Sequence, residues 1–247
     1  GHSGDDINKN RANANKLLVR FLLEQCEKTD LRLCDIQAGG LHNAIPREAH
    51  ATVAVPTAYA ATFVTELEAF VAKVREEFSA TEPDLTAALE AADAASTCIC
   101  PEQAVRMLKS LSVVHNGIFA MSQDLEGLVE TSSNLASVRK QGNQVVATTS
   151  QRSSVASNLE YMAAVVRSAF ELGGAKCVTN EGYPGWKMNP KSEILKVCVE
   201  SYKRLFGKEP LVRAIHAGLE CGLFSEKYPN LDMVSFGPTL RGVHSPD

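Results

Sequence analysis

The sequence predicts an α+β domain, an antiparallel sheet covered by helices, followed by a smaller part of α/β character. Up to about residue 185, predicted helices are mixed with short strands and a hairpin, an order typical of α+β layers. After Gly185, helices and strands alternate, which favours parallel strands. With 45% hydrophobic and 22% charged residues, the 247-residue chain has enough apolar side chains for a core. We therefore expect two unequal parts, 1–185 and 186–247.

Apolar periodicity defines the elements of the first part. Residues at helical spacing predict helices over 8–26, 57–78, 103–111 and 155–170. Strands are expected at 31–37, 51–55, 135–138 and 145–149, the last two joined in a hairpin at Gly142. Segment 85–92 fits a helix or a strand, because its alanine-rich composition favours neither. The apolar stripes of 57–78 and 155–170 suit a core or a dimer surface, and core is favoured for most of each stripe.

The second part is shorter and more regular in its order. A helix over 193–206 precedes a short apolar run at 211–215, a helix from about Ala217 and a second run at 233–236. We expect the two runs to be parallel strands.

Charge and hydropathy exclude two classes of protein. The net charge is −4, from 25 basic and 29 acidic residues, and the basic residues are not clustered, so no nucleic-acid partner is expected. The apolar stretch at 17–23 is short and contains Arg20, so no membrane span is expected either. The seven cysteines are scattered without zinc-site spacing, which is typical of reduced thiols in a cytoplasmic protein. The chain starts without Met and ends in a predicted loop, so both ends are expected to be cut.

Three of the six histidines stand in contexts that suit a ligand, although none has metal-site spacing by itself. His2 lies between small residues that allow close approach, and the alternative is a flexible loop. His216 precedes Ala217-Gly218, where simple helix packing is the alternative. His244 follows a predicted strand in a turn-rich segment, where ligands bind in open α/β sheets, and a neutral imidazole there suits a metal.

Two further polar residues suit substrate binding. Arg152 ends a predicted strand directly before Ser153-Ser154, which are good N-cap residues. A guanidinium beside the free N–H groups of a helix start would bind a carboxylate, and a solvated strand end is the equal alternative. Asn43 follows two glycines and would hydrogen-bond a substrate, although turn chemistry explains it equally well. Spacing alone therefore assembles no complete catalytic site.

Four motifs together resemble a known family. In chain order they are Gly1-His2-Ser3-Gly4-Asp5-Asp6-Ile7, the segment from Gly39 to Ala49 (GGLHNAIPREA), His216-Ala217-Gly218-Leu219-Glu220-Cys221-Gly222, and Gly237-Pro238-Thr239 with Gly242-Val243-His244-Ser245-Pro246. In this order and spacing the sequence resembles bacterial aminoacyl-histidine dipeptidases, the cytosolic metallopeptidases that split carnosine. The resemblance spans essentially the whole chain.

The resemblance implies a homodimeric exopeptidase with two zinc ions and a lid domain inserted in its catalytic domain. Residues 1–185 would be the lid and dimerisation domain, and 186–247 the last portion of an incomplete α/β zinc-peptidase catalytic domain. By the same resemblance, His2 would stabilise the oxyanion in the partner subunit's site. Asn43 would hold the substrate backbone, Arg152 its C-terminal carboxylate, and Gly218 would lie against the substrate. His244 would be a zinc ligand.

The same resemblance places the remaining zinc ligands and the general base before Gly1. With one ligand present, this chain is expected to be inactive alone, and the mechanism belongs to the intact enzyme. One alternative is a related metallopeptidase of other dipeptides or N-acyl amino acids. Another is a dimerisation or peptide-binding module without catalysis.

Overall fold

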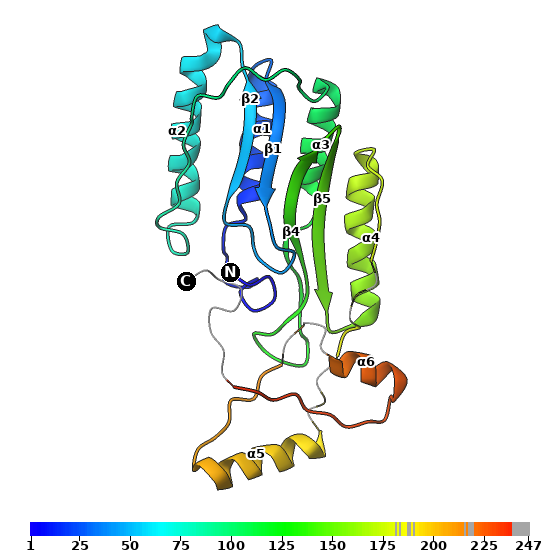
Figure 1. Ribbon diagram of the computed structural model, residues 1–247. Helices are drawn as coiled ribbons and strands as arrows, with labels where there is room; N and C mark the ends of the chain where they lie inside the picture. Colours follow the sequence, from blue (N-terminus) through cyan, green and yellow to red (C-terminus); the bar gives the residue numbers. More distant parts are fainter. Residues whose placement is uncertain are drawn as a thin grey trace.

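The structure, a computed structural model, describes residues 1–180, 182, 184–186, 189, 191–214, 216 and 220–238. Within these residues the first part is a five-stranded antiparallel sheet with helices packed on one face (Figure 1). The strands are β1 (Arg32–Gly39), β2 (Ala49–Ala54), β3 (Gly117–Met121), β4 (Val129–Gln141) and β5 (Gln144–Ser153). The predicted α+β layer is confirmed, whereas strand β3 was not predicted.

Strand β4 is the centre of the sheet. Along one edge it pairs with β5, and the hairpin turns at Gly142, whose φ of +58° suits glycine. Strand β1 pairs with residues 137–139 of β4, and β3 pairs with residues 129–133. Because a strand has only two edges, β1 and β3 must share the second edge and lie end to end.

Side-chain amides complete the sheet where β1 and β3 leave a gap. The N–H of Leu135 donates to Asn116 Oδ1 at 2.9 Å, and its carbonyl accepts from Asn15 Nδ2 at 3.0 Å and Asn13 Nδ2 at 3.1 Å. Buried backbone groups are costly without partners, so these amides replace a missing strand. They also connect the start of the first helix to the centre of the sheet.

Four helices belong to the first part. They are α1 (Ala14–Lys28), α2 (Ala60–Glu77, preceded by the 3-10 turn η1 at Thr57–Tyr59), α3 (Pro101–Val113) and α4 (Ala156–Leu172). Helix α1 begins later than the predicted residue 8. The reason is local: Asn10 has a positive φ of 51°, and the Asn13 side chain accepts from the N–H groups of Asn15 and Lys16 as an N-cap.

One hydrophobic core joins these helices to the sheet. The ring of Phe21 on α1 lies 5.3 Å from that of Phe63 and 5.2 Å from that of Phe70, both on α2. Leu108 of α3 and Met162 of α4 are fully buried in the same cluster. The stripes of α2 and α4 therefore serve the core, as the periodicity favoured. Segment 79–100 forms neither the helix nor the strand that composition left open, and we call it the strap.

The second part contains α5 (Glu193–Phe206) and α6 (Glu220–Lys227). The helix predicted at 193–206 is confirmed. The strands predicted at 211–215 and 233–236 are wrong for the residues described there, which are irregular. A parallel strand is stable only beside other strands, and no described strand lies in the second part to receive them. The domain boundary near Gly185 and the α/β character of this part stay predictions.

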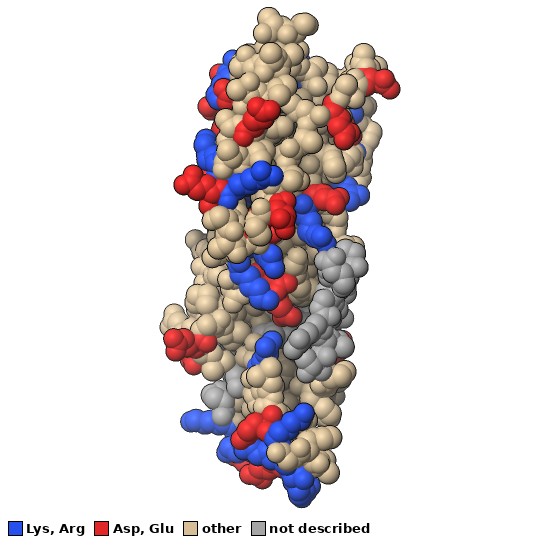
Figure 2. Space-filling view, turned by 90° about the vertical axis from the view of Figure 1, so that its left-hand side faces the viewer, with Lys and Arg blue, Asp and Glu red and all other residues tan. Residues whose placement is uncertain are grey.

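One face of the molecule shows the mixed charge that the sequence predicts. On the face seen in Figure 2, basic and acidic side chains are interspersed rather than gathered in a basic patch. Arg20–Glu77 and Lys28–Glu66 are among the ion pairs of the described residues. Among the described helices, none is both long and apolar enough to cross a membrane.

Candidate functional site

The N-terminal segment forms one wall of the candidate site. Its backbone pairs with the loop after β1: Ser3 N–H donates to Asn43 O, and Ile45 N–H donates to Gly1 O, both at 2.8 Å. An isolated antiparallel bridge joins His2 to Ala44 between these bonds. The loop is in turn fixed to the sheet, because Asn134 Nδ2 donates to Ala44 O at 2.8 Å. The first two motifs of the sequence thus form one structural unit.

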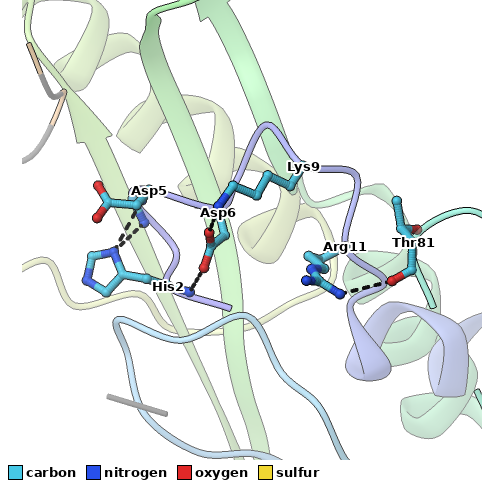
Figure 3. Close-up of polar contacts among 7 residues, drawn as sticks. His2, Asp5, Asp6, Lys9, Arg11 and Thr81 are labelled. Carbon is cyan, nitrogen blue, oxygen red and sulfur yellow. Dashed lines mark hydrogen bonds and ion pairs between the residues drawn. The ribbon is translucent and has the colours of Figure 1, made fainter. Parts of the chain in front are cut away.

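The imidazole of His2 is oriented by its own loop (Figure 3). Its Nδ1 accepts from Gly4 N–H at 3.1 Å and from Asp5 N–H at 3.2 Å. A nitrogen that accepts two N–H donors carries no proton, so the neutral ring bears its proton on Nε2. His2 therefore presents Nε2–H as a hydrogen-bond donor, which is the polarity needed to stabilise an oxyanion.

Asp6 closes the same loop. The His2 backbone N–H donates to Asp6 Oδ2 at 2.7 Å, and Lys9 Nζ lies 2.5 Å from Asp6 Oδ1 (Figure 3). Burial acts to raise the pKa of Asp6, but the hydrogen bonds and charge of Lys9 and His2 outweigh it and lower the pKa overall. The carboxylate is therefore ionised at neutral pH and holds the backbone of His2 in place.

Gly4 has a steric role in this motif. A Cβ at Gly4 would lie 3.1 Å from Cε1 and Nδ1 of His2 and 3.7 Å from Arg152 Nη1. The imidazole and the guanidinium thus both approach the backbone at Gly4. Only glycine leaves this space open without displacing the His2 ring.

Arg152 is the cationic residue of the site. It lies on β5 opposite Ser132 of β4, in the penultimate position of the strand. Burial lowers the pKa of Arg152, and the nearby charge of Asp5 opposes this. Its Nε is buried and has no hydrogen-bond partner among the described residues. A buried donor of a permanent cation without a partner marks a place for an anion, and a carboxylate fits the guanidinium geometry.

The prediction that Ser153 and Ser154 cap the helix after Arg152 is wrong. Helix α4 begins at Ala156 with Val155 as its N-cap, and no side chain caps it. Ser153 instead accepts the Val155 N–H at 3.0 Å and contacts Thr131 Oγ1 at 2.8 Å, closing the turn after β5. An anion at this place would therefore be bound by the guanidinium itself and not by free N–H groups of a helix.

His216 brings the second part of the chain to the same place. It is 4% exposed, and its Nε2 lies 2.9 Å from Ser132 Oγ, the residue opposite Arg152. Burial, together with the charges of Arg152 and His2, lowers the pKa of His216 to about 4. The ring is therefore neutral at pH 7. The sequence singled out His216 but assigned it no role, because nothing local indicates its contact with Ser132.

The remaining predicted residues are placed as follows. Asn43 lies beside the His2 bridge and contributes its backbone carbonyl to Ser3. The structure thus brings His2, Asn43 and Arg152 together at one end of the sheet. Gly218 and His244 lie outside the described residues. Within the described part of the chain, no three His, Cys, Asp or Glu side chains form a group that could hold a metal ion.

A family model described as a peptidase dimerisation domain matches residues 1–82 of the chain. The chain is 39% identical over 247 residues to the cytosol non-specific dipeptidase of Escherichia coli (strain K12), of which it covers 51%. It matches the crystal structure of aminoacylhistidine dipeptidase from Vibrio alginolyticus with a TM-score of 0.89 and 39% identity, over 100% of this chain and 50% of that one.

These comparisons confirm the resemblance that the four motifs predicted. The chain spans about half the length of the relatives it matches.

Proposed function

We propose that this chain is part of a zinc-dependent dipeptidase that hydrolyses aminoacyl-histidine dipeptides such as carnosine. Residues 1–185 are its lid and dimerisation domain, and 186–247 are the C-terminal portion of its catalytic domain. The observation that carries the proposal is the meeting of His2, Arg152 and His216 at one end of the sheet, in a chain similar to dipeptidases over its whole length.

In this proposal the residues of the chain bind and polarise the substrate. Arg152 receives the C-terminal carboxylate of the dipeptide through its guanidinium, whose Nε has no hydrogen-bond partner among the described residues. His2 donates from Nε2–H to the carbonyl oxygen as negative charge develops on it. Asn43 holds the substrate backbone, and Gly218 lies against the substrate. Because His2 and Arg152 are neighbours, both serve one site, which the resemblance assigns to the partner subunit.

The zinc ions are part of the proposal through the resemblance alone. His244 is the one ligand expected from this chain, and it lies outside the described residues. The described residues form no metal-binding group by themselves, and one ligand cannot hold two ions. The 247-residue chain by itself is therefore expected to be inactive.

A broader specificity is the second candidate function. The curated relative is a non-specific dipeptidase, which favours recognition of the peptide backbone and terminal carboxylate over the histidine side chain. The described site agrees with this, because Arg152 and His2 address groups that every dipeptide has.

Carnosine hydrolysis with added zinc tests the proposal, measured in parallel on this chain and on the protein extended to the full length of its relatives. We expect activity only in the extended protein. Dipeptides without histidine and N-acyl amino acids, assayed alongside, separate the two candidate functions. Activity in neither protein on any of these substrates would leave a non-catalytic module as the function.

Homodimerisation and a cytoplasmic location complete the proposal. The first is supported by the match of residues 1–82 to a dimerisation domain and the second by the cytosolic relative. Sedimentation of the purified protein at several concentrations measures homodimerisation, and fractionation of the source cells measures the cytoplasmic location.

A further inference from the structure

Two cysteine thiols meet where the strap passes the start of β1. Cys34 Sγ lies 2.8 Å from Cys98 Sγ, although 64 residues separate them along the chain. Both are free thiols. Disulfide sulfurs lie about 2.05 Å apart, so the two atoms are within an ångström of bonding distance. Among the described residues, no other two cysteine sulfurs contact each other.

The backbone around the pair is already docked in the position that a bridge requires. Ile99 N–H donates to Leu33 O at 2.8 Å, one residue from each cysteine. Ile99 also packs against the hydrophobic core. Since β1 pairs with β4 only at residues 37–39, the strap at this point covers the open edge of β1. The close approach of the two thiols therefore follows from backbone pairing and core packing.

The middle of the strap has few other attachments. At its start, Arg11 donates to Thr81 O at 2.9 Å (Figure 3), and Arg75 donates to Leu85 O at 2.6 Å. Residues 86–97 form no hydrogen bond to any described residue. The strap is thus fixed at 81–85 and again at 98–99, with an exposed stretch of polypeptide between them. A covalent bond at Cys98 would strengthen the attachment of the strap at 98–99, which has fewer hydrogen bonds than the attachment at 81–85.

We propose that Cys34 and Cys98 are a redox-modification site that forms a reversible disulfide and fastens the strap to β1. The electron acceptor is a low-molecular-weight disulfide of the glutathione type. The exposed Cys98 thiolate attacks that disulfide, forms a mixed disulfide and releases one small thiol. Cys34 then attacks the Cys98 sulfur and releases the second small thiol. The two protein thiols lose two electrons, and their two protons leave on the two small thiols.

The order of these steps follows from accessibility. Cys34 is buried and Cys98 is exposed, so only Cys98 can meet a soluble disulfide first. Burial, and the hydrogen bond with Cys98, raise the pKa of the Cys34 thiol, so the second attack becomes faster as the pH rises.

The test uses the reduced protein and glutathione disulfide. After oxidation, limited digestion with a glutamate-specific protease cuts the strap at Glu90, between the two cysteines. We expect the two fragments to stay joined on a non-reducing gel and to separate after reduction. Mass spectrometry should find the peptides of Cys34 and Cys98 linked, and the number of titratable thiols should fall from seven to five.

Matched variants make the result specific. Cys34→Ser and Cys98→Ser should each abolish the joined fragments, whereas Cys100→Ser and Cys177→Ser should leave them unchanged. The oxidised wild-type protein should also melt several degrees higher than the reduced protein, because the bond closes a long loop in the unfolded chain. A Cys98–Cys100 bond, a glutathione adduct that persists on Cys98, or separation of the fragments without reductant would overturn the proposal.

Discussion

The two parts of this molecule differ in how completely they bury their own apolar residues. In the first part, α1 to α4 and the sheet share one continuous core. In the second part, α5 has no buried residue, and Val197 and Leu205 on it are 55% and 70% exposed. An amphipathic helix forms where its apolar face has a partner. The first part has its partners within this sequence, whereas the described second part has few.

The two parts meet through a small number of close contacts. A Cβ at Gly222 of the second part would lie 2.4 Å from Pro184 O of the first part. The side-chain contact between Ser132 and His216 adds to this. Glycine allows backbones to approach this closely. The second part is thus positioned at the end of β5 beside Arg152, although it shares little of the core.

The largest expected effect is on the free energy of unfolding, which a substitution in the first part should lower far more than one in the second part. Leu108→Ala on α3 removes a fully buried side chain and should lower the free energy of unfolding by about 2–5 kcal/mol. Val197→Ala on α5 removes a mostly exposed one and should change it by less than about 0.5 kcal/mol. Urea denaturation of both variants measures the difference. Equal losses would mean that α5 is packed as well as α3.

A second prediction concerns the oriented histidine in the full-length protein, the proposed dipeptidase. His2→Ala should lower kcat about 10²–10³-fold with little change in KM, because a donor to the developing oxyanion is lost. Gly4→Ala should lower kcat less, since its Cβ displaces the ring without removing it. The exposed His42→Ala is the matched control and should leave kcat unchanged. Raised KM with normal kcat in His2→Ala would assign His2 to ground-state binding.

The contact between the two parts should respond to acid. His216 has a pKa of about 4 when folded and 6.5 as the ordinary value, so the unfolded chain binds more protons between these pH values. Its contribution to the free energy of unfolding is present above pH 6.5 and is lost as the pH falls towards 4, by at most about 3 kcal/mol.

Two variants isolate this effect. His216→Gln should show a smaller loss of stability between pH 6.5 and 4.5 than the wild type, whereas His42→Gln, at an exposed position, should follow the wild type. An NMR titration measures the His216 pKa directly. A value near 6.5 would contradict the buried, neutral ring.

The sequence predicted the strongly patterned elements and missed those that depend on tertiary contacts. The stripe of α2 and the Gly142 hairpin have local signals of period and turn chemistry. Strand β3 has none, because it is half exposed and its pairing with β4 is interrupted by bulges near Ile118 and Ala120. The strands predicted in the second part failed for the opposite reason: their composition suits a buried strand, but no described strand lies beside them.

The candidate site likewise combines residues that have a local sequence signal with contacts that depend on the tertiary structure. Motifs identified His2, Asn43 and Arg152 because glycine, small residues and a strand end are visible along the chain. The sequence did not predict the orphaned Nε of Arg152 or the bond between Ser132 and His216. Both arise from burial by segments more than 80 residues apart in the chain, and periodicity carries no information on such contacts.

The most direct test of the proposed site is a cycle of Arg152 and the substrate carboxylate in the full-length protein, the proposed dipeptidase. With carnosine, Arg152→Ala should lower kcat/KM by about 10–100-fold, mostly through KM, because a charge-assisted contact is lost. Arg167→Ala, a surface change on α4, is the control. With the C-terminal amide of carnosine, wild type and Arg152→Ala should have similar kcat/KM. An equal loss on both substrates would show that Arg152 does not bind the carboxylate and would contradict the proposed site.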